Sequence, residues 1–182
     1  MEISLSSVWT DLIAFAKNPR LDPLPSHFLE LPKKVIPYLL AIDLLLMFPL
    51  SGIISLAGIE EMDHAVIELL NKPLLLFFMA VILAPLFEEA IFRYPIGRLF
   101  NNRFKLIFWL FTIIFAGVHL SNFGADIPYY LMPLLVLPQF ILGIILGYIR
   151  VGWGFWYCVF FHALHNGILV GMATLAGAFG QT

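Results

Sequence analysis

The segment Pro73–Arg93 reads PLLLFFMAVILAPLFEEAIFR and decides the class of fold. No charged side chain occurs as far as Phe87, and Glu88, Glu89 and Arg93 then follow within six residues. A bilayer core about 30 Å thick needs about 20 apolar residues in a helix. The segment therefore predicts a transmembrane helix, spanning residues 73 to about 98, that carries ionisable groups inside the membrane.

Hydrophobic runs of similar length fill the rest of the chain. Residues 35–57 form a run that Asp43 alone interrupts, and residues 104–123 and 127–149 form two more. Residues 151–182 carry no charge and would make a helix roughly 48 Å long, so this run either extends past the bilayer or breaks near a glycine. We expect an all-α, polytopic integral membrane helix bundle with five or six transmembrane helices.

The first 32 residues have a different character. From Leu5 to Ala16, apolar residues such as Val8, Leu12 and Phe15 alternate with polar ones, which predicts an amphipathic helix on the membrane surface. Residues 18–32 contain four prolines and are predicted to be a linker. We therefore divide the chain into residues 1–32, a surface helix and linker, and residues 33–182, the transmembrane domain.

The composition agrees with a membrane protein. Hydrophobic residues make up 61% of the 182 residues and charged residues 12%, against roughly 25% charged in soluble proteins. A net charge of −2, with no basic cluster larger than Lys33–Lys34, excludes the nucleic-acid-binding class. The lipid bilayer is the predicted partner.

The distribution of Lys and Arg predicts the orientation, because these residues accumulate on the cytoplasmic side. On one side of the predicted spans lie Lys17, Arg20, Lys33, Lys34, Arg98, Arg103, Lys105 and Arg150. Lys72 lies on the other side, after a loop that carries Glu60, Glu61, Asp63 and Glu68. We expect a multi-pass cell-membrane protein with a cytoplasmic amino terminus and, for five spans, an external carboxyl terminus.

The ionisable residues of the second span are candidates for function, because charge inside a bilayer costs several kcal/mol and is rarely kept without a role. Successive residues turn by about 100° in a helix, so Glu89 and Arg93 share a face and can form a pair. Glu88 then faces elsewhere, free to line a cavity and to transfer protons. The alternative is a buried ion cluster that only fixes helix packing.

Two further helices carry polar residues at a matching depth. Phe115 and His119 share a face of the third span, and a hairpin turning at residues 101–105 places His119 level with Glu88, roughly 20 Å from the turn. His162 and Asn166 share a face of the last span at a similar depth. His165, three residues after His162, is expected to turn toward a neighbouring helix rather than join the cluster.

Three motifs on successive hydrophobic runs carry a resemblance to a known family. They are E-E-x-x-x-R (Glu88, Glu89, Arg93), F-x-x-x-H (Phe115, His119) and H-x-x-x-N (His162, Asn166). Together they resemble the type II CAAX prenyl endopeptidase family, also called the Abi or CPBP family of intramembrane proteases. The resemblance covers about residues 73–172.

The resemblance implies a role for each motif residue. Glu88 and His119 would activate a water, and His162 with Asn166 would form the oxyanion hole. Glu89 and Arg93 would act as supports. The implied function is an intramembrane endopeptidase that cleaves a membrane-associated or lipid-linked peptide or protein.

A zinc mechanism could use the same residues, since Glu88, His119 and His162 make a three-ligand set with one open position. The chain lacks the H-E-x-x-H motif, its single cysteine, Cys158, excludes a cysteine-rich site, and side-chain donors suffice for an oxyanion hole. We therefore expect a glutamate-type protease without a cofactor, with zinc as the alternative.

Two other classes of function compete with the protease. One is a non-catalytic member of the same family that binds peptides or confers self-immunity against a bacteriocin. The other is a transporter with a proton-relay carboxylate, which is disfavoured because the chain has no internal repeat in two halves. The sequence leaves the identity and prenylation of the substrate and the oligomeric state open.

Overall fold

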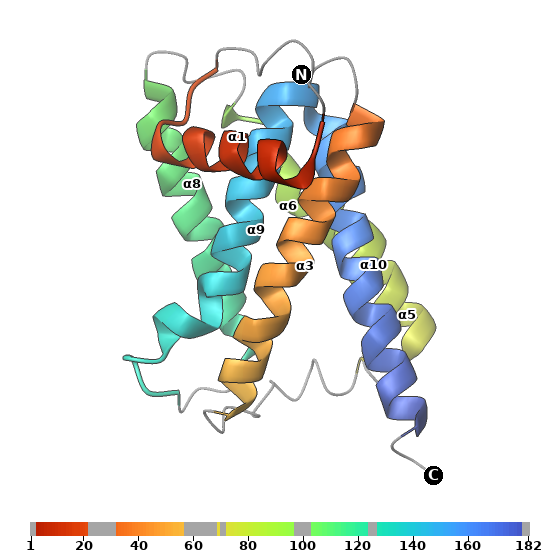
Figure 1. Cartoon of the computed structure of the whole chain (residues 1–182). Coiled ribbons are helices and arrows are strands. Elements are labelled where there is room, and N and C mark those ends of the chain that lie inside the picture. Colours follow the sequence, from red (N-terminus) through yellow and green to blue (C-terminus); the bar gives the residue numbers. More distant parts are fainter. Residues whose placement is uncertain are drawn as a thin grey trace.

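The computed structural model describes residues 3–21, 32–56, 69, 72–96, 103–123 and 127–179 (Figure 1). Its segments, in chain order, are α1 (Leu5–Lys17), α3 (Pro32–Leu56), α5 (Pro73–Phe77), η1 (Phe78–Leu83), α6 (Ala84–Phe92), α8 (Phe104–Val118), η3 (His119–Asn122), α9 (Met132–Trp153) and α10 (Phe155–Phe179). η1 is a π-helix that joins α5 to α6, and η3 is a 3₁₀ turn that ends α8. The described part is all-helical, as predicted.

Five helical segments in the described part are long and apolar enough to cross a bilayer. They are α3, the continuous α5–η1–α6 segment, α8 with η3, α9 and α10, and they run alternately up and down the bundle (Figure 1). In the long uncharged run at the carboxyl end, residues 151–153 complete α9 and Gly154, with a φ of +91°, separates α9 from α10. α10 then continues as one helix from Phe155 to Phe179. The protein is therefore a polytopic membrane helix bundle, and five spans is the alternative that the structure supports.

Several helix boundaries differ from the predicted ones, two of them by five residues or more. The second span ends at Phe92 rather than near residue 98, because the chain turns at residues 93–95, where Pro95 cannot continue a helix. α9 begins at Met132 rather than at residue 127, with Pro133 in its first turn, where a proline costs no hydrogen bond. Most of the predicted linker, the acidic loop with Glu60, Glu61, Asp63 and Glu68, and Arg98 lie outside the described residues.

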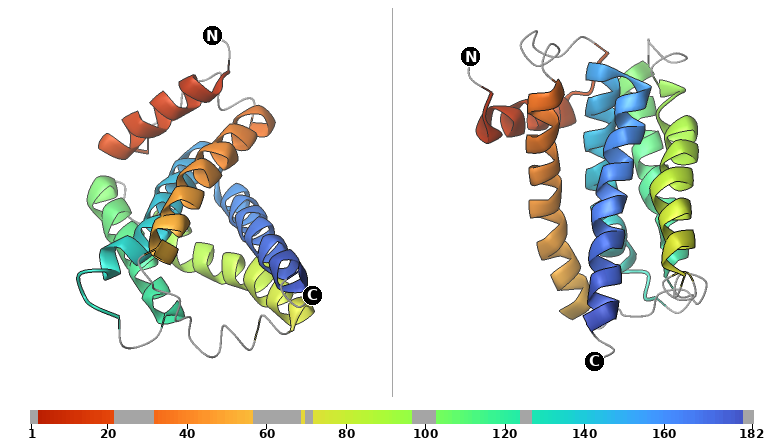
Figure 2. Two further views of the ribbon diagram at one scale, coloured as in Figure 1. Left: turned by 60° about the horizontal axis from the view of Figure 1, so that its bottom comes forward. Right: turned by 90° about the vertical axis from the view of Figure 1, so that its right-hand side faces the viewer.

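α9 is the central helix of the bundle. Half of its span is buried, against 22–28% for the other four, and Figure 2 shows α9 and α10 between α3 on one side and α6 with α8 on the other. α8 approaches α9 closely at two glycines. A Cβ on Gly147 would collide with the ring of Phe108, and one on Gly143 would lie 3.0 Å from Cγ2 of Thr112. This small-xxx-small spacing holds α8 against the centre of the bundle.

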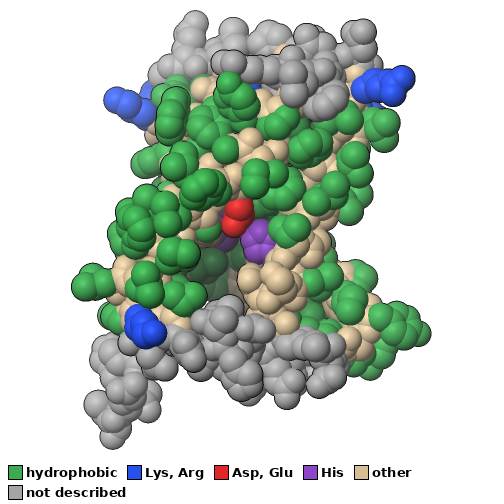
Figure 3. Space-filling model, turned by 180° about the vertical axis from the view of Figure 1, so that it is seen from behind, with side chains coloured by type: hydrophobic (Ala, Val, Ile, Leu, Met, Phe, Trp, Pro, Cys, Tyr) green, Lys and Arg blue, Asp and Glu red, His purple; other side chains and the backbone are tan. Residues whose placement is uncertain are grey.

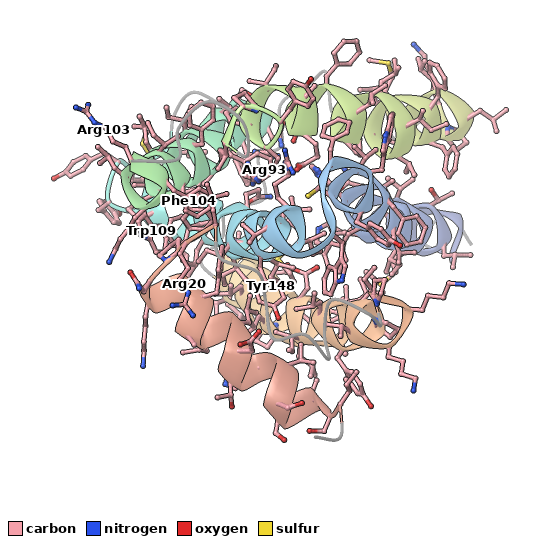
Figure 4. The ribbon with its side chains drawn as sticks, turned by 90° about the horizontal axis from the view of Figure 1, so that it is seen from above. Arg20, Arg93, Arg103, Phe104, Trp109 and Tyr148 are labelled. Atoms are coloured by element: carbon pink, nitrogen blue, oxygen red, sulfur yellow. The ribbon has the colours of Figure 1, made fainter. Side chains whose placement is uncertain are left out.

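The amphipathic helix α1 forms as predicted and lies across the bundle at the end where α3 begins (Figure 1). Its apolar stripe of Val8, Leu12 and Phe15 is buried against the bundle. The ring of Phe15 meets that of Tyr148 on α9 edge to face, and the Tyr148 hydroxyl donates to Asp11 over 2.6 Å. In Figure 4, Tyr148 lies on the side of α9 that faces α1 and α3. The apolar stripe of α1 therefore packs against the other helices of the bundle.

Candidate active site

A buried ion pair lies beneath the candidate site. Glu89 and Arg93 follow one another on α6 and the turn after it, and both side chains are fully buried. Oε2 of Glu89 is 3.8 Å from Nε of Arg93, and Oε1 is 3.0 Å from Nδ1 of His162 on α10. A carboxylate accepts, so His162 donates to it through Nδ1. Glu89 therefore joins α6 to α10 and fixes the His162 ring.

Arg93 points into the interior between α6, α8 and α9 (Figure 4). Its Nη2 donates to the carbonyl of Gly143 over 3.4 Å, and its Cζ is 4.5 Å from the centre of the Phe115 ring. The Phe115 ring also packs edge-on against the rings of His119, at 5.0 Å, and His162, at 5.9 Å. Phe115 therefore packs against both imidazoles, and Arg93 packs against Phe115.

The Glu88 side chain points toward both imidazoles. Its Oε2 is 3.8 Å from Nε2 of His119 and 3.9 Å from Nε2 of His162. These two distances are too long for direct hydrogen bonds and short enough for one water to bridge the atoms. α6, the end of α8 and α10 thus meet at one place, at the common depth that residue counting predicted.

A hydrogen bond to the backbone orients the His119 ring. Nδ1 of His119 lies 2.8 Å from the carbonyl oxygen of Phe115, and a carbonyl can only accept, so Nδ1 carries the hydrogen. In neutral His119 the unprotonated Nε2 then faces Glu88. His119 is the first residue of η3, where the change from α-helix to 3₁₀ turn ends α8. The site therefore presents a carboxylate and an imidazole acceptor side by side.

The site opens onto a hydrophobic face of the molecule. The side chain of Glu88 is 26% exposed and that of His119 16%, whereas Glu89 is fully buried. Figure 3 shows an acidic side chain and a histidine in a hollow surrounded by hydrophobic side chains. A reactant would therefore reach the cluster from the bilayer side of the bundle.

Asn166, one helical turn after His162 on α10, makes a different contact from the other motif residues. Its Nδ2 donates to the backbone carbonyl of Ala80 in η1 over 2.8 Å. This bond joins α10 to the π-helix that precedes α6. The structure thus places Asn166 beside the cluster with one amide hydrogen already bonded to backbone.

His165 turns toward a neighbouring helix, as predicted. Its Nδ1 is within hydrogen-bonding distance of Oδ2 of Asp43 on α3, and both side chains are buried. The Asp43–His165 pair was not predicted, because Asp43 stands out in the sequence only as an interruption of the first span. An ionisable residue in an otherwise apolar span was the available signal.

The alternative of a three-ligand zinc site stays a prediction. A tetrahedral zinc holds its ligand atoms about 2.0–2.2 Å away, and among the described residues no group of three His, Cys, Asp or Glu side chains has that geometry. Glu88, His119 and His162 are the residues that such a site would have used. We derive no catalytic step through a metal.

In the described part, five helical segments are long enough to cross a bilayer, and a carboxylate and two imidazoles meet at a hollow in a hydrophobic face of their bundle. Residues 70–168 match the type II CAAX prenyl endopeptidase Rce1-like family. This match spans more than half of the chain, so the chain belongs to that family, as its three motifs indicated. Its general class is the CAAX-protease type of intramembrane endopeptidase. No curated protein and no solved structure matches the chain.

Proposed function

We propose that this protein hydrolyses a peptide bond of a membrane-associated peptide or protein by a glutamate-type mechanism. The observation that carries the proposal is the convergence of Glu88 Oε2 with the Nε2 atoms of His119 and His162, at 3.8 and 3.9 Å. One water bound among these atoms would touch a base and have a second acceptor beside it. The hollow on the hydrophobic face supports a substrate that arrives through the bilayer.

The hydrolysis follows from the geometry of these groups. The Glu88 carboxylate takes one proton from the water, while His119 Nε2 accepts a hydrogen bond from the O–H that remains, and the water oxygen attacks the scissile carbonyl carbon. The oxyanion then accepts a hydrogen bond, and the carbon–nitrogen bond breaks. Glu88 returns the proton to the leaving amine, so that one water is consumed and an amine and a carboxyl group are formed.

His162 is the proposed oxyanion donor. With both ring nitrogens protonated, it donates through Nδ1 to Glu89 and presents Nε2–H to the site. The two carboxylates, Glu88 and Glu89, then balance the two positive charges of Arg93 and His162. Arg93 in turn lies 3.8 Å from the other oxygen of Glu89. Glu89 and Arg93 are therefore proposed as supports, in agreement with their complete burial.

The test is a comparison of purified, folded variants on membrane peptides with and without a prenyl group. Glu88→Gln keeps the shape of the side chain and removes the base, so cleavage should fall by about 100-fold or more. Phe87→Leu, at the exposed neighbouring position, is the matched control and should stay within about threefold. Full activity of Glu88→Gln would show that another group activates the water.

The proposed mechanism needs no metal cofactor. Activity of the purified protein should therefore survive dialysis against a strong zinc chelator, and metal analysis should find far less than one zinc per chain. Loss of activity on chelation with recovery on added zinc would overturn the cofactor-free mechanism. The same preparation without any cleavage of any peptide would favour a non-catalytic member of the family.

We propose that the end of the bundle bearing α1 faces the cytoplasm. Among the described residues, seven basic side chains belong to that end: Lys17, Arg20, Lys33, Lys34, Arg103, Lys105 and Arg150. Lys72, before α5, is the described basic residue at the opposite end. This asymmetry supports a cytoplasmic amino terminus.

A further inference from the structure

The π-helix η1 leaves one backbone carbonyl without a helical donor. At its end, the N–H of Ala84 donates to the carbonyl of Met79, five residues back. The next residue of this series, Pro85, would donate to Ala80 but has no N–H. In this π-register the carbonyl of Ala80 therefore has no helical donor, in a segment where the bilayer supplies no water to bond it.

Asn166 supplies the missing donor to the Ala80 carbonyl. Its Nδ2 donates to the Ala80 oxygen over 2.8 Å, which is a good hydrogen bond. Gly167, the next residue on α10, faces η1 at this level, and a Cβ there would lie at the ordinary contact distance of 3.6 Å from Cγ1 of Val81. η1 and α10 are thus joined at this level by the Asn166 hydrogen bond.

The rotation of α6 depends on this junction. A π-turn holds one more residue than an α-helical turn, so it changes the direction of every later side chain by about 100°. Glu88 and Glu89 lie on α6, which follows η1 directly, and both face His162, which lies one turn before Asn166 on α10. The Asn166 bond therefore fixes the helix that carries the proposed base relative to the helix that carries the proposed oxyanion donor.

We propose that Asn166 is a positioning residue, which together with Pro85 holds the π-turn and so aims Glu88 at the two imidazoles. This role differs from the oxyanion donation that the family resemblance implied for Asn166. Where activity is the readout, the proposal rests on the proposed peptidase function. Where stability is the readout, it stands on the Ala80 bond alone.

A double-mutant cycle between positions 85 and 166 tests the proposal. Pro85→Ala restores an N–H that can bond the Ala80 carbonyl. Asn166→Ala should lower the Tm in detergent by about 5 °C in the wild-type background and by much less in the Pro85→Ala background. The non-additivity is the predicted signature of the shared carbonyl.

Cleavage kinetics in the same four proteins separate positioning from direct catalysis. Asn166→Ala should lower kcat by about 10- to 100-fold with KM within about threefold, and in the Pro85→Ala background it should cost less than about threefold. Gly167→Ala, which adds a methyl at ordinary contact distance beside the Asn166 bond, is the matched control and should keep the wild-type Tm within about 2 °C.

The kcat and Tm measurements decide between a positioning role and direct catalysis for Asn166. An equal loss of kcat in both backgrounds would make Asn166 a direct oxyanion donor and overturn the positioning role. Additive Tm shifts would show that Asn166 and Pro85 do not share the carbonyl, which also overturns it. If the wild type cleaves nothing, the proposed peptidase function fails while the Tm cycle still decides whether Asn166 holds the π-turn.

Discussion

Arg93 shows how one residue supports the site without touching a substrate. Its guanidinium neutralises the Glu89 carboxylate, donates to the Gly143 carbonyl and stacks over Phe115, and the side chain is 1% exposed. One planar guanidinium group thus makes an ion pair, a hydrogen bond and a stacking contact. A lysine has a single point charge and cannot provide them together.

We therefore expect Arg93→Lys to destabilise the protein by about 2 kcal/mol, because the stacking and one hydrogen bond are lost while the charge remains. Unfolding in detergent, followed by circular dichroism, measures the change. Arg103→Lys is the matched control, since Arg103 is exposed and points away from the bundle in Figure 4, and it should change stability by less than about 0.5 kcal/mol. Equal effects of the two substitutions would mean that the Arg93 contacts contribute nothing.

At the scale of helices, the sequence predicts position along the membrane normal better than rotation. Hydropathy and residue counting place Glu88, His119 and His162 at one level, and the structure brings them together. The π-turn before Pro85 and the Asp43 partner of His165 were not predicted. Both depend on which neighbouring helix packs against each face of a span. A span that is apolar on all sides has no periodicity that would predict this packing.

The Asp43–His165 pair gives a prediction at this scale, because it joins α3 to α10. Asp43→Leu removes the acceptor and leaves a buried imidazole without its partner, which should cost about 3 kcal/mol of stability. Asp43→Asn keeps an oxygen acceptor and should cost less than half as much. Chemical denaturation of the three proteins in one detergent measures the difference.

A double substitution provides the control for the Asp43–His165 prediction. Asp43→Leu with His165→Leu removes both polar groups and should recover most of the lost stability, as apolar replacements of buried pairs often do. If Asp43→Leu alone unfolds at the wild-type denaturant concentration, the pair does not hold α3 against α10.

At the scale of the whole molecule, the two amino-terminal helices α1 and α3 lie outside the region that matches the family, residues 70–168. Besides apolar packing, each makes a hydrogen bond to that region through one acidic side chain. Asp11 accepts from Tyr148 on α9, and Asp43 bonds His165 on α10. The matched region carries the candidate site, and the first two helices brace α9 and α10 from the side away from Glu88.

The orientation of the whole bundle yields the last prediction. Five spans place the start of α3 and the end of α10 at opposite ends of the molecule (Figure 1), and basic residues gather at the end bearing α1. A reporter enzyme that folds only outside the cytoplasm should therefore be active when fused after residue 182 and inactive when fused before residue 1. Replacing Lys33 and Lys34 by glutamine, with Lys72→Gln as the control, should weaken this preference, because the bias of Lys and Arg near the first span sets the topology. Activity of the amino-terminal fusion alone would reverse the orientation, and equal activity of both fusions would contradict an odd number of spans.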